Sequence, residues 1–282
     1  MRFVRNPQLW LALAKELWEH NRGQNLNQVA ASLAFTTTLS LVPMITVASM
    51  WLGYLPRVIQ IKNAIQNWLL DTYMPGGLNH QVFLYLNQFS SKAKGLTLAG
   101  SLGLVVTTIM TMMVIERAFN QLFRVRKTRP ILKKVAIYGA ATILGPILLG
   151  SGIYLSGLLL SAAEGWTPAL TFGLRAFATI APILLAIAVY VVAYKFLPYA
   201  PVLWRDALSG ALFAALAFEV MKFGFGLFLT HAAFYKTVYG AFAIFPLALT
   251  WIYMTWWITM AGAVLVANLP KIRSGLIRVI RY

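Results

Sequence analysis

Two oppositely charged residues, Glu219 and Lys222, lie three positions apart within an apolar stretch that covers residues 207–230. In a helix this spacing places both side chains on one face. The stretch is long enough to cross a bilayer, where each charge near the centre costs about 2.5 to 3.5 kcal/mol on insertion scales. An ion pair that only fixes helix packing would explain the two residues, but an apolar pair would do this at lower cost. The pair therefore favours a functional site that faces a polar cavity.

A second charged group ends another apolar stretch, where Glu116 and Arg117 are followed one helical turn later by Asn120. A charged side chain near a helix end can extend to the membrane surface, where water solvates it. This structural explanation accounts for the group at least as well as a binding role does. Two further cations, Lys195 and Arg205, stand near the ends of neighbouring apolar stretches. We expect these cations to be available to an anionic group.

Hydroxyl side chains, including Thr37 and Ser40, gather before Pro43 in the first apolar stretch. They either satisfy carbonyls that the proline frees, line a hydrated path, or form hydrogen bonds between helices. The predicted substrate-binding or cavity residues are therefore Thr37, Ser40, Glu116, Arg117, Asn120, Lys195, Arg205, Glu219 and Lys222.

The residues that most enzymes need are missing from this chain. It has no cysteine, and its three histidines, His20, His80 and His231, lie in separate regions without a second ligand at metal-binding spacing. No glycine-rich Gly-Lys loop for nucleotide phosphates is present either. We predict no catalytic residue, no metal site and no cofactor, and hence a protein that is not an enzyme.

The elements that must position these residues are membrane spans. Hydrophobic residues make up 60% of the 282 residues and charged ones only 11%, with a mean hydropathy of +0.71. Six apolar runs each meet the roughly 20 residues that a helix needs to cross the hydrocarbon core. They cover residues 29–52, 96–118, 135–160, 174–197, 207–230 and 241–267. Continuous apolar runs exclude alternating barrel strands, so the predicted fold class is an all-α polytopic membrane protein.

Prolines fall inside four of the six predicted spans: Pro43, Pro146, Pro182 and Pro246. Each is expected to free a carbonyl and kink its helix. The order of a proline-containing span, a glutamate-containing span and another proline-containing span occurs in both halves. That order suggests an internal repeat of the kind found in transporters.

Three regions follow from this division of the chain. Residues 1–28 form an N-terminal segment in which an amphipathic helix over 7–21 lies in the cytoplasmic interface, and the first apolar run is a retained helix rather than a signal peptide. Residues 29–267 form the six-helix domain, with an outer loop over 53–95 whose apolar spacing predicts two short helices. Residues 268–282 form a basic cytoplasmic tail.

The distribution of positive charge sets the orientation. With both termini in the cytoplasm, seventeen of the 24 Lys and Arg residues fall on the inner side and six on the outer side. The same bias explains most of the net charge of +17, together with attraction to anionic lipid headgroups. Nucleic acid is therefore not an expected partner, whereas membrane lipids are.

Several short motifs occur along the chain: Ala30-Ala31-Ser32-Leu33-Ala34-Phe35, Leu39-Ser40-Leu41-Val42-Pro43, Glu116-Arg117-Ala118-Phe119-Asn120, Phe196-Leu197-Pro198, Trp204-Arg205-Asp206-Ala207-Leu208-Ser209-Gly210-Ala211, Tyr239-Gly240 and Gly262-Ala263. Together they are similar to motifs of the YihY/BrkB family of bacterial inner-membrane proteins. Their order and spacing cover nearly the whole chain. The family usually has Gly-Ala-Glu in the last span, whereas Val264 takes the acidic position here.

This resemblance implies a multi-pass protein of the bacterial inner membrane. The family has carried two labels, ribonuclease BN and a serum-resistance or virulence factor, and the metal-binding residues of a ribonuclease are missing here. The leading hypothesis is a transporter or binder of an anionic, lipid-like molecule, such as a lipid-linked precursor. Two alternatives stay open: a proton- or ion-coupled solute transporter that uses Glu219 and Glu116, and a non-transporting scaffold for envelope assembly.

Overall fold

The structure is a computed structural model that describes residues 26–53, 98–125, 127, 129–139, 168–231 and 244–273. It contains five long helices: α2 (Leu26–Gly53), α5 (Leu98–Leu122), α7 (Pro168–Phe196), α8 (Trp204–His231) and α10 (Ile244–Arg273). Residues 131–139 form a further helical segment. These ranges contain no strand, which confirms the all-α prediction for the described part of the chain. The predicted N-terminal helix, the helices of the outer loop and most of the predicted span 135–160, with Pro146, lie outside these ranges.

The helix bounds agree with the predicted spans for α2, α5 and α8 to within a few residues, whereas α7 begins at Pro168, before the predicted start at residue 174. At its C-terminal end α10 differs, because it continues to Arg273 and so takes in the start of the predicted tail. Lys271 and Arg273 occupy its last turn, where positive charge interacts favourably with the exposed carbonyl groups of a helix end. Lys271 also donates a hydrogen bond of 3.1 Å to the side chain of Asn268. These contacts explain why the helix extends past the apolar run.

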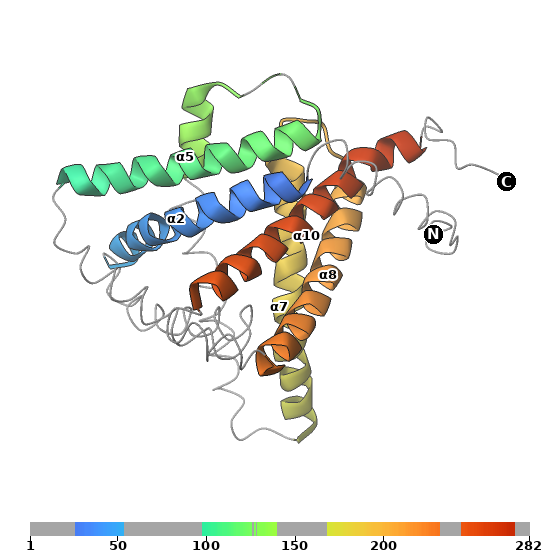
Figure 1. Ribbon diagram of the computed structural model, residues 1–282. Helices are drawn as coiled ribbons and strands as arrows, with labels where there is room; N and C mark the ends of the chain where they lie inside the picture. The colour runs from blue at the N-terminus through green and yellow to red at the C-terminus, as the bar shows by residue number, and fades with distance from the viewer. Residues whose placement is uncertain are drawn as a thin grey trace.

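Two helix pairs pack against a central helix. α2 packs beside α5 and α7 beside α8, while α10 contacts all four (Figure 1). In Figure 1 the pairs converge where α2 and α8 begin and where α5, α7 and α10 end, and they diverge toward the opposite ends. These are the five helix ends that the distribution of Lys and Arg predicts to lie on the cytoplasmic side.

A tight turn follows α5 at this converging end. The Val125 amide donates to the Asn120 carbonyl at 2.8 Å and the Arg124 amide to the Gln121 carbonyl at 3.1 Å, which together form a Schellman motif. Arg124 takes the left-handed position at φ 54°, which glycine usually fills. The turn reverses the chain, so that the helical segment 131–139 returns alongside the site described below.

The outward face of α8 is apolar. Leu208, Leu212, Leu216, Val220 and Phe223 recur at helical spacing and are exposed. The opposite face carries small and apolar residues that are buried against α7 and α10. Exposed apolar side chains along a whole helix face are typical of a helix surrounded by lipid. Among the described residues, two helices are long and apolar enough to cross a membrane, Trp204–His231 and Phe245–Lys271, and a shorter apolar helix covers Pro182–Phe196. The predicted total of six spans stays a prediction.

Glycines allow α7, α8 and α10 to approach closely. Tyr194 of α7 is fully buried, and its hydroxyl donates a 2.9 Å hydrogen bond to the carbonyl of Thr259. A Cβ atom on Gly262 would lie only 2.2 Å from that hydroxyl, and one on Gly210 would lie 2.2 Å from the Val266 side chain. Small residues at helix contacts are a common means of packing in membranes. The two glycines lie within motifs that carry the family resemblance, and in the structure they leave room for the neighbouring helices.

Candidate functional site

The side chain of Glu116, near the end of α5, is completely buried. One of its oxygens lies 3.1 Å from the ammonium nitrogen of Lys134, which is also buried. The other accepts a hydrogen bond of 3.4 Å from the Asn120 side-chain amide, and the Tyr138 hydroxyl interacts with the same carboxylate. The carboxylate therefore has a charged partner, Lys134, and a neutral partner, Tyr138, in the helical segment 131–139. Its partner within α5, Asn120, is neutral.

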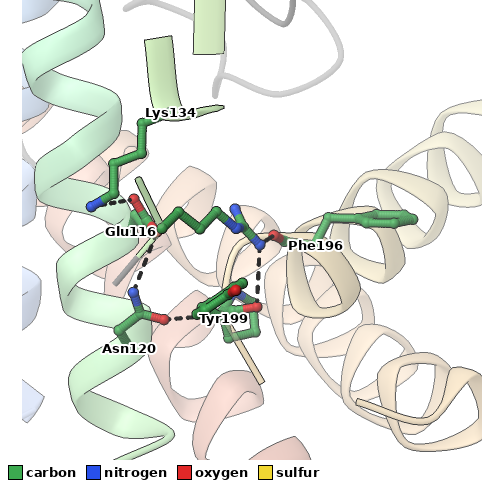
Figure 2. A network of polar contacts seen from close by, with 7 residues as sticks. Glu116, Asn120, Lys134, Phe196 and Tyr199 are labelled. Carbon is green, nitrogen blue, oxygen red and sulfur yellow. Dashed lines mark hydrogen bonds and ion pairs between the residues drawn. The ribbon is translucent and has the colours of Figure 1, made fainter. Parts of the chain in front are cut away.

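Polar contacts extend from Asn120 to the end of α7 (Figure 2). The side-chain oxygen Oδ1 of Asn120 accepts a 2.7 Å hydrogen bond from the backbone amide of Tyr199. Arg129 donates to the carbonyl of Phe196 at 2.5 Å, and its guanidinium carbon lies 5.4 Å from the centre of the Tyr199 ring. This network joins α5, the turn after it, the segment 131–139 and the chain that follows α7.

Lys134 is a member of this network that the sequence reasoning treated only as one of many cytoplasmic charges. Glu116 and Lys134 each stand nine positions from Val125, at the turn between the two segments. Opposite charges placed symmetrically about a short turn are a signal that would have suggested the pair. The physical reason for the pair is that a buried carboxylate is costly unless a positive charge lies beside it.

Arg117 lies one residue beyond Glu116 and points elsewhere. It lines an open groove of about 340 Å³ between α2 and α5, together with the polar residues Gln28, Ser32 and Gln121. The apolar part of the lining is Val29, Leu33, Val114 and Ala118. Among the described residues, no carboxylate lines the groove and none forms an ion pair with Arg117. The groove thus presents one exposed cation and several neutral hydrogen-bonding groups.

Glu219 and Lys222 form an ion pair along α8, as their spacing predicts. The two charged groups are 2.7 Å apart, with 32% of the glutamate side chain and 20% of the lysine side chain exposed. The lysine ammonium also lies 5.6 Å from the centre of the Phe218 ring. The pair flanks the apolar outward face of the helix, and its predicted role in function stays a prediction.

The remaining predicted site residues lie apart from the groove. Lys195 donates to the Val202 carbonyl and lies 5.3 Å from the centre of the Trp204 ring, while Arg205 is exposed in the first turn of α8. The hydroxyl of Thr37 accepts a 2.9 Å hydrogen bond from the Trp256 indole. Ser40 shares a buried 2.5 Å hydrogen bond with Thr111. Both hydroxyl groups therefore join helices, which is one of the roles that the sequence left open.

The three predicted kink prolines that the structure describes occupy different helix positions. Pro182 lies inside α7 and Pro43 lies within the bounds of α2, whereas Pro246 falls in the first turn of α10. A proline in a first turn removes an amide that has no partner within the helix, so it is tolerated there. The sequence reasoning did not single out Pro270, which lies inside α10 near its C-terminal end.

A second ion pair that the sequence reasoning missed joins α8 to α10. The buried carboxylate of Asp206, in the first turn of α8, pairs with Arg273 in the last turn of α10. No pattern within either segment predicts this contact, because 67 positions separate the two residues. Within the described ranges, no three His, Asp or Glu side chains gather where they would hold a metal ion.

Comparison with known proteins identifies relatives along nearly the whole chain. Residues 17–276 match the family described as Virulence factor BrkB. The UPF0761 membrane protein RSc1559 of Ralstonia nicotianae is 43% identical over 89% of this chain and 57% of its own length. The UPF0761 membrane protein Bxeno_A3061 of Paraburkholderia xenovorans is 44% identical over 93% of this chain and 61% of its own length.

These relatives are longer than this chain, which spans about 57% to 65% of the curated relatives it matches. Their names describe membrane proteins and contain no enzymatic activity. No solved structure matches the chain. The family match and the names of the relatives agree with the motifs and with the apolar helices. The chain therefore belongs to the BrkB family of membrane proteins, also called UPF0761.

Proposed function

We propose that this membrane protein binds an anionic, lipid-like molecule at its cytoplasmic side and moves it across the bacterial inner membrane. The observation that carries the proposal is the exposed guanidinium of Arg117 in the groove between α2 and α5. A guanidinium group binds phosphate or carboxylate through two parallel hydrogen bonds, with defined geometry. The proposal includes six spans with both termini in the cytoplasm.

Four other cations in the helices have partners within the protein, which supports this choice by contrast. Lys134, Lys222 and Arg273 each pair with a carboxylate of the protein. Lys195 donates to a backbone carbonyl. Arg117 is exposed and has no carboxylate partner among the described residues, so the groove is open to an anion from outside the chain. The Glu219–Lys222 pair lies on α8, which does not line this groove.

Replacing Arg117 with glutamine tests the proposal directly. Gently purified protein is expected to carry an acidic lipid or lipid-linked molecule, measured by mass spectrometry relative to the bulk membrane. Loss of a hydrogen bond to a charged group costs about 1.5 to 3 kcal/mol, so Arg117→Gln should lower this enrichment roughly tenfold or more. The matched control is Lys133→Gln, which removes an exposed cation outside the groove. Equal enrichment in the wild type and Arg117→Gln would contradict the proposal.

The orientation can be tested because the chain has no native cysteine. A single cysteine at Lys127, in the turn after α5, should react with an impermeant thiol reagent only after the membrane is opened. A single cysteine at Glu164, in the predicted outer segment, should react in intact spheroplasts. The positive-inside rule predicts this result. Labelling of the Lys127→Cys protein from outside would reverse the orientation.

A proton-coupled transporter is a second candidate, and the burial of Glu116 favours it. A buried carboxylate beside a lysine is a typical component of proton pathways in membranes. Transport into liposomes distinguishes the two candidates. Uptake that stops when the proton gradient is removed would support proton coupling, whereas lipid transfer without a gradient would support the proposal above.

A further inference from the structure

We infer that the groove between α2 and α5 is the head-group end of a lipid site, which holds a phosphodiester lipid from the cytoplasmic leaflet with one acyl chain along the outward faces of both helices. The inference rests on the proposed function and adds the class of lipid, its leaflet and the path of its tail. It is argued from the polar lining of the groove and from the apolar residues that continue it.

The groove offers donors from two helices to a group with several oxygen atoms. Arg117 and Gln121 come from α5, and Gln28 and Ser32 come from α2. A tetrahedral phosphate presents oxygen atoms in several directions, whereas a carboxylate presents two in one plane. Amide and hydroxyl groups around the guanidinium therefore suit a phosphate. The described lining has one cation and no carboxylate, which matches the single negative charge of a phosphodiester.

An apolar stripe leads away from the groove along α2. Phe35 and Leu39 follow Ser32 at helical spacing, and each has more than half of its surface exposed. Leu39 stands seven residues beyond Ser32, which corresponds to about 10 Å along a helix. This length accommodates a substantial part of an acyl chain. Exposed apolar residues next to a polar groove also indicate that the groove is reached from the bilayer.

A matching stripe follows α5. Val114 lines the groove, and Met110 and Val106 continue from it at spacings of four, both more than half exposed. α2 and α5 pack directly beside each other and are joined by the hydrogen bond between Ser40 and Thr111. Their stripes therefore run side by side from the same polar end. The polar groove can thus bind a head group while the adjoining apolar stripes contact its tail. A soluble anion would not need these stripes.

Photo-crosslinking in reconstituted vesicles tests the tail path. The probe is phosphatidylglycerol, an anionic phosphodiester lipid, with a diazirine in its acyl chain. The control probe is phosphatidylethanolamine with the same chain, because its ammonium group offsets the charge of its phosphodiester and should weaken binding beside Arg117. We expect the charged probe to label the stripes at Phe35, Leu39, Val106 and Met110 more than the exposed apolar face of α8. Arg117→Gln should reduce that labelling to the level seen on α8, while Lys133→Gln should not. Thermal unfolding of each variant confirms that it is folded.

Three results would overturn the inference. The first is equal labelling of the α2, α5 and α8 faces by the charged probe, which would indicate only the surrounding lipid. The second is displacement of the charged probe by glycerol phosphate at the same concentration, which would assign the groove to a soluble anion. The third is formation of covalent dimers through single cysteines at Phe35 and Met110, which would make this face a contact between two copies.

These results separate the inference from the proposed function. If Arg117→Gln lowers the enrichment of acidic lipids while the labelling is uniform, the groove binds an anion and the tail path is wrong. If the enrichment is equal in wild type and variant, both are wrong. Labelling that is confined to the two stripes and depends on Arg117 supports both.

Discussion

Replacement of Lys134 with methionine is expected to lower the free energy of unfolding by about 3 to 5 kcal/mol, because it leaves a buried carboxylate without its counter-charge. Glu116 has no exposed surface and lies 3.1 Å from the lysine nitrogen. Asn120 holds one carboxylate oxygen only through a long hydrogen bond of 3.4 Å, so it cannot replace the lost cation. Unfolding of the purified protein by denaturant or heat measures the effect.

A second variant identifies the cause of that loss. Combining Lys134→Met with Glu116→Gln removes both charges and should recover most of the stability, since an uncharged pair of similar size avoids the cost of an unpaired buried charge. Lys133→Met is the matched control, because Lys133 is exposed on the same segment. If Lys134→Met and Lys133→Met unfold alike, the pair does not contribute to stability in the bilayer.

Substitution of Gly262 by leucine is expected to separate α10 from α7 and α8 and to destabilise the bundle. Overpacking typically costs about 1 to 3 kcal/mol, and this site lies at the upper end because the contact is with a rigid ring rather than with a flexible side chain. A Cβ atom there would lie 2.2 Å from the hydroxyl and 2.9 Å from the ring carbon of Tyr194. Tyr194 cannot move away easily, because it is fully buried and its hydroxyl is hydrogen-bonded to the carbonyl of Thr259.

Gly224 provides the control for this substitution. It also lies in a helix, α8, but a Cβ atom on it would meet nothing within 4 Å. Gly224→Leu should therefore be tolerated, and Gly262→Ala should already be harmful because the clash begins at the Cβ atom. The thermal midpoints of the three purified variants provide the comparison. Equal midpoints for Gly262→Leu and Gly224→Leu would show that α10 and α7 do not pack closely at this point.

For the described ranges, the sequence determined where the long helices lie, because the length of an apolar run is a local property that the thickness of the bilayer sets. The bounds of α2 and α8 follow closely from these runs. The contact between Glu219 and Lys222 was also predictable, since three positions in a helix bring two side chains together whatever the rest of the chain does. The uneven distribution of Lys and Arg marked the same helix ends that converge in Figure 1.

Only the tertiary structure decided which helix faces meet. In a helix that is apolar on all sides, hydrophobic periodicity does not distinguish the face that packs from the face that meets lipid. The contacts of Asp206 with Arg273 and of Gly262 with Tyr194 join segments far apart in the sequence. No pattern within one helix reveals either contact.

The neighbouring residues Glu116 and Arg117 show this division most clearly. The sequence presents them as one charged group at the end of a span. In the structure a helical step of about 100° turns one side chain inward and the other outward. Glu116 is buried against Lys134, and Arg117 lines the open groove. Packing of α5 against its neighbours buries one charge and leaves the other exposed, because only one side of the helix is covered.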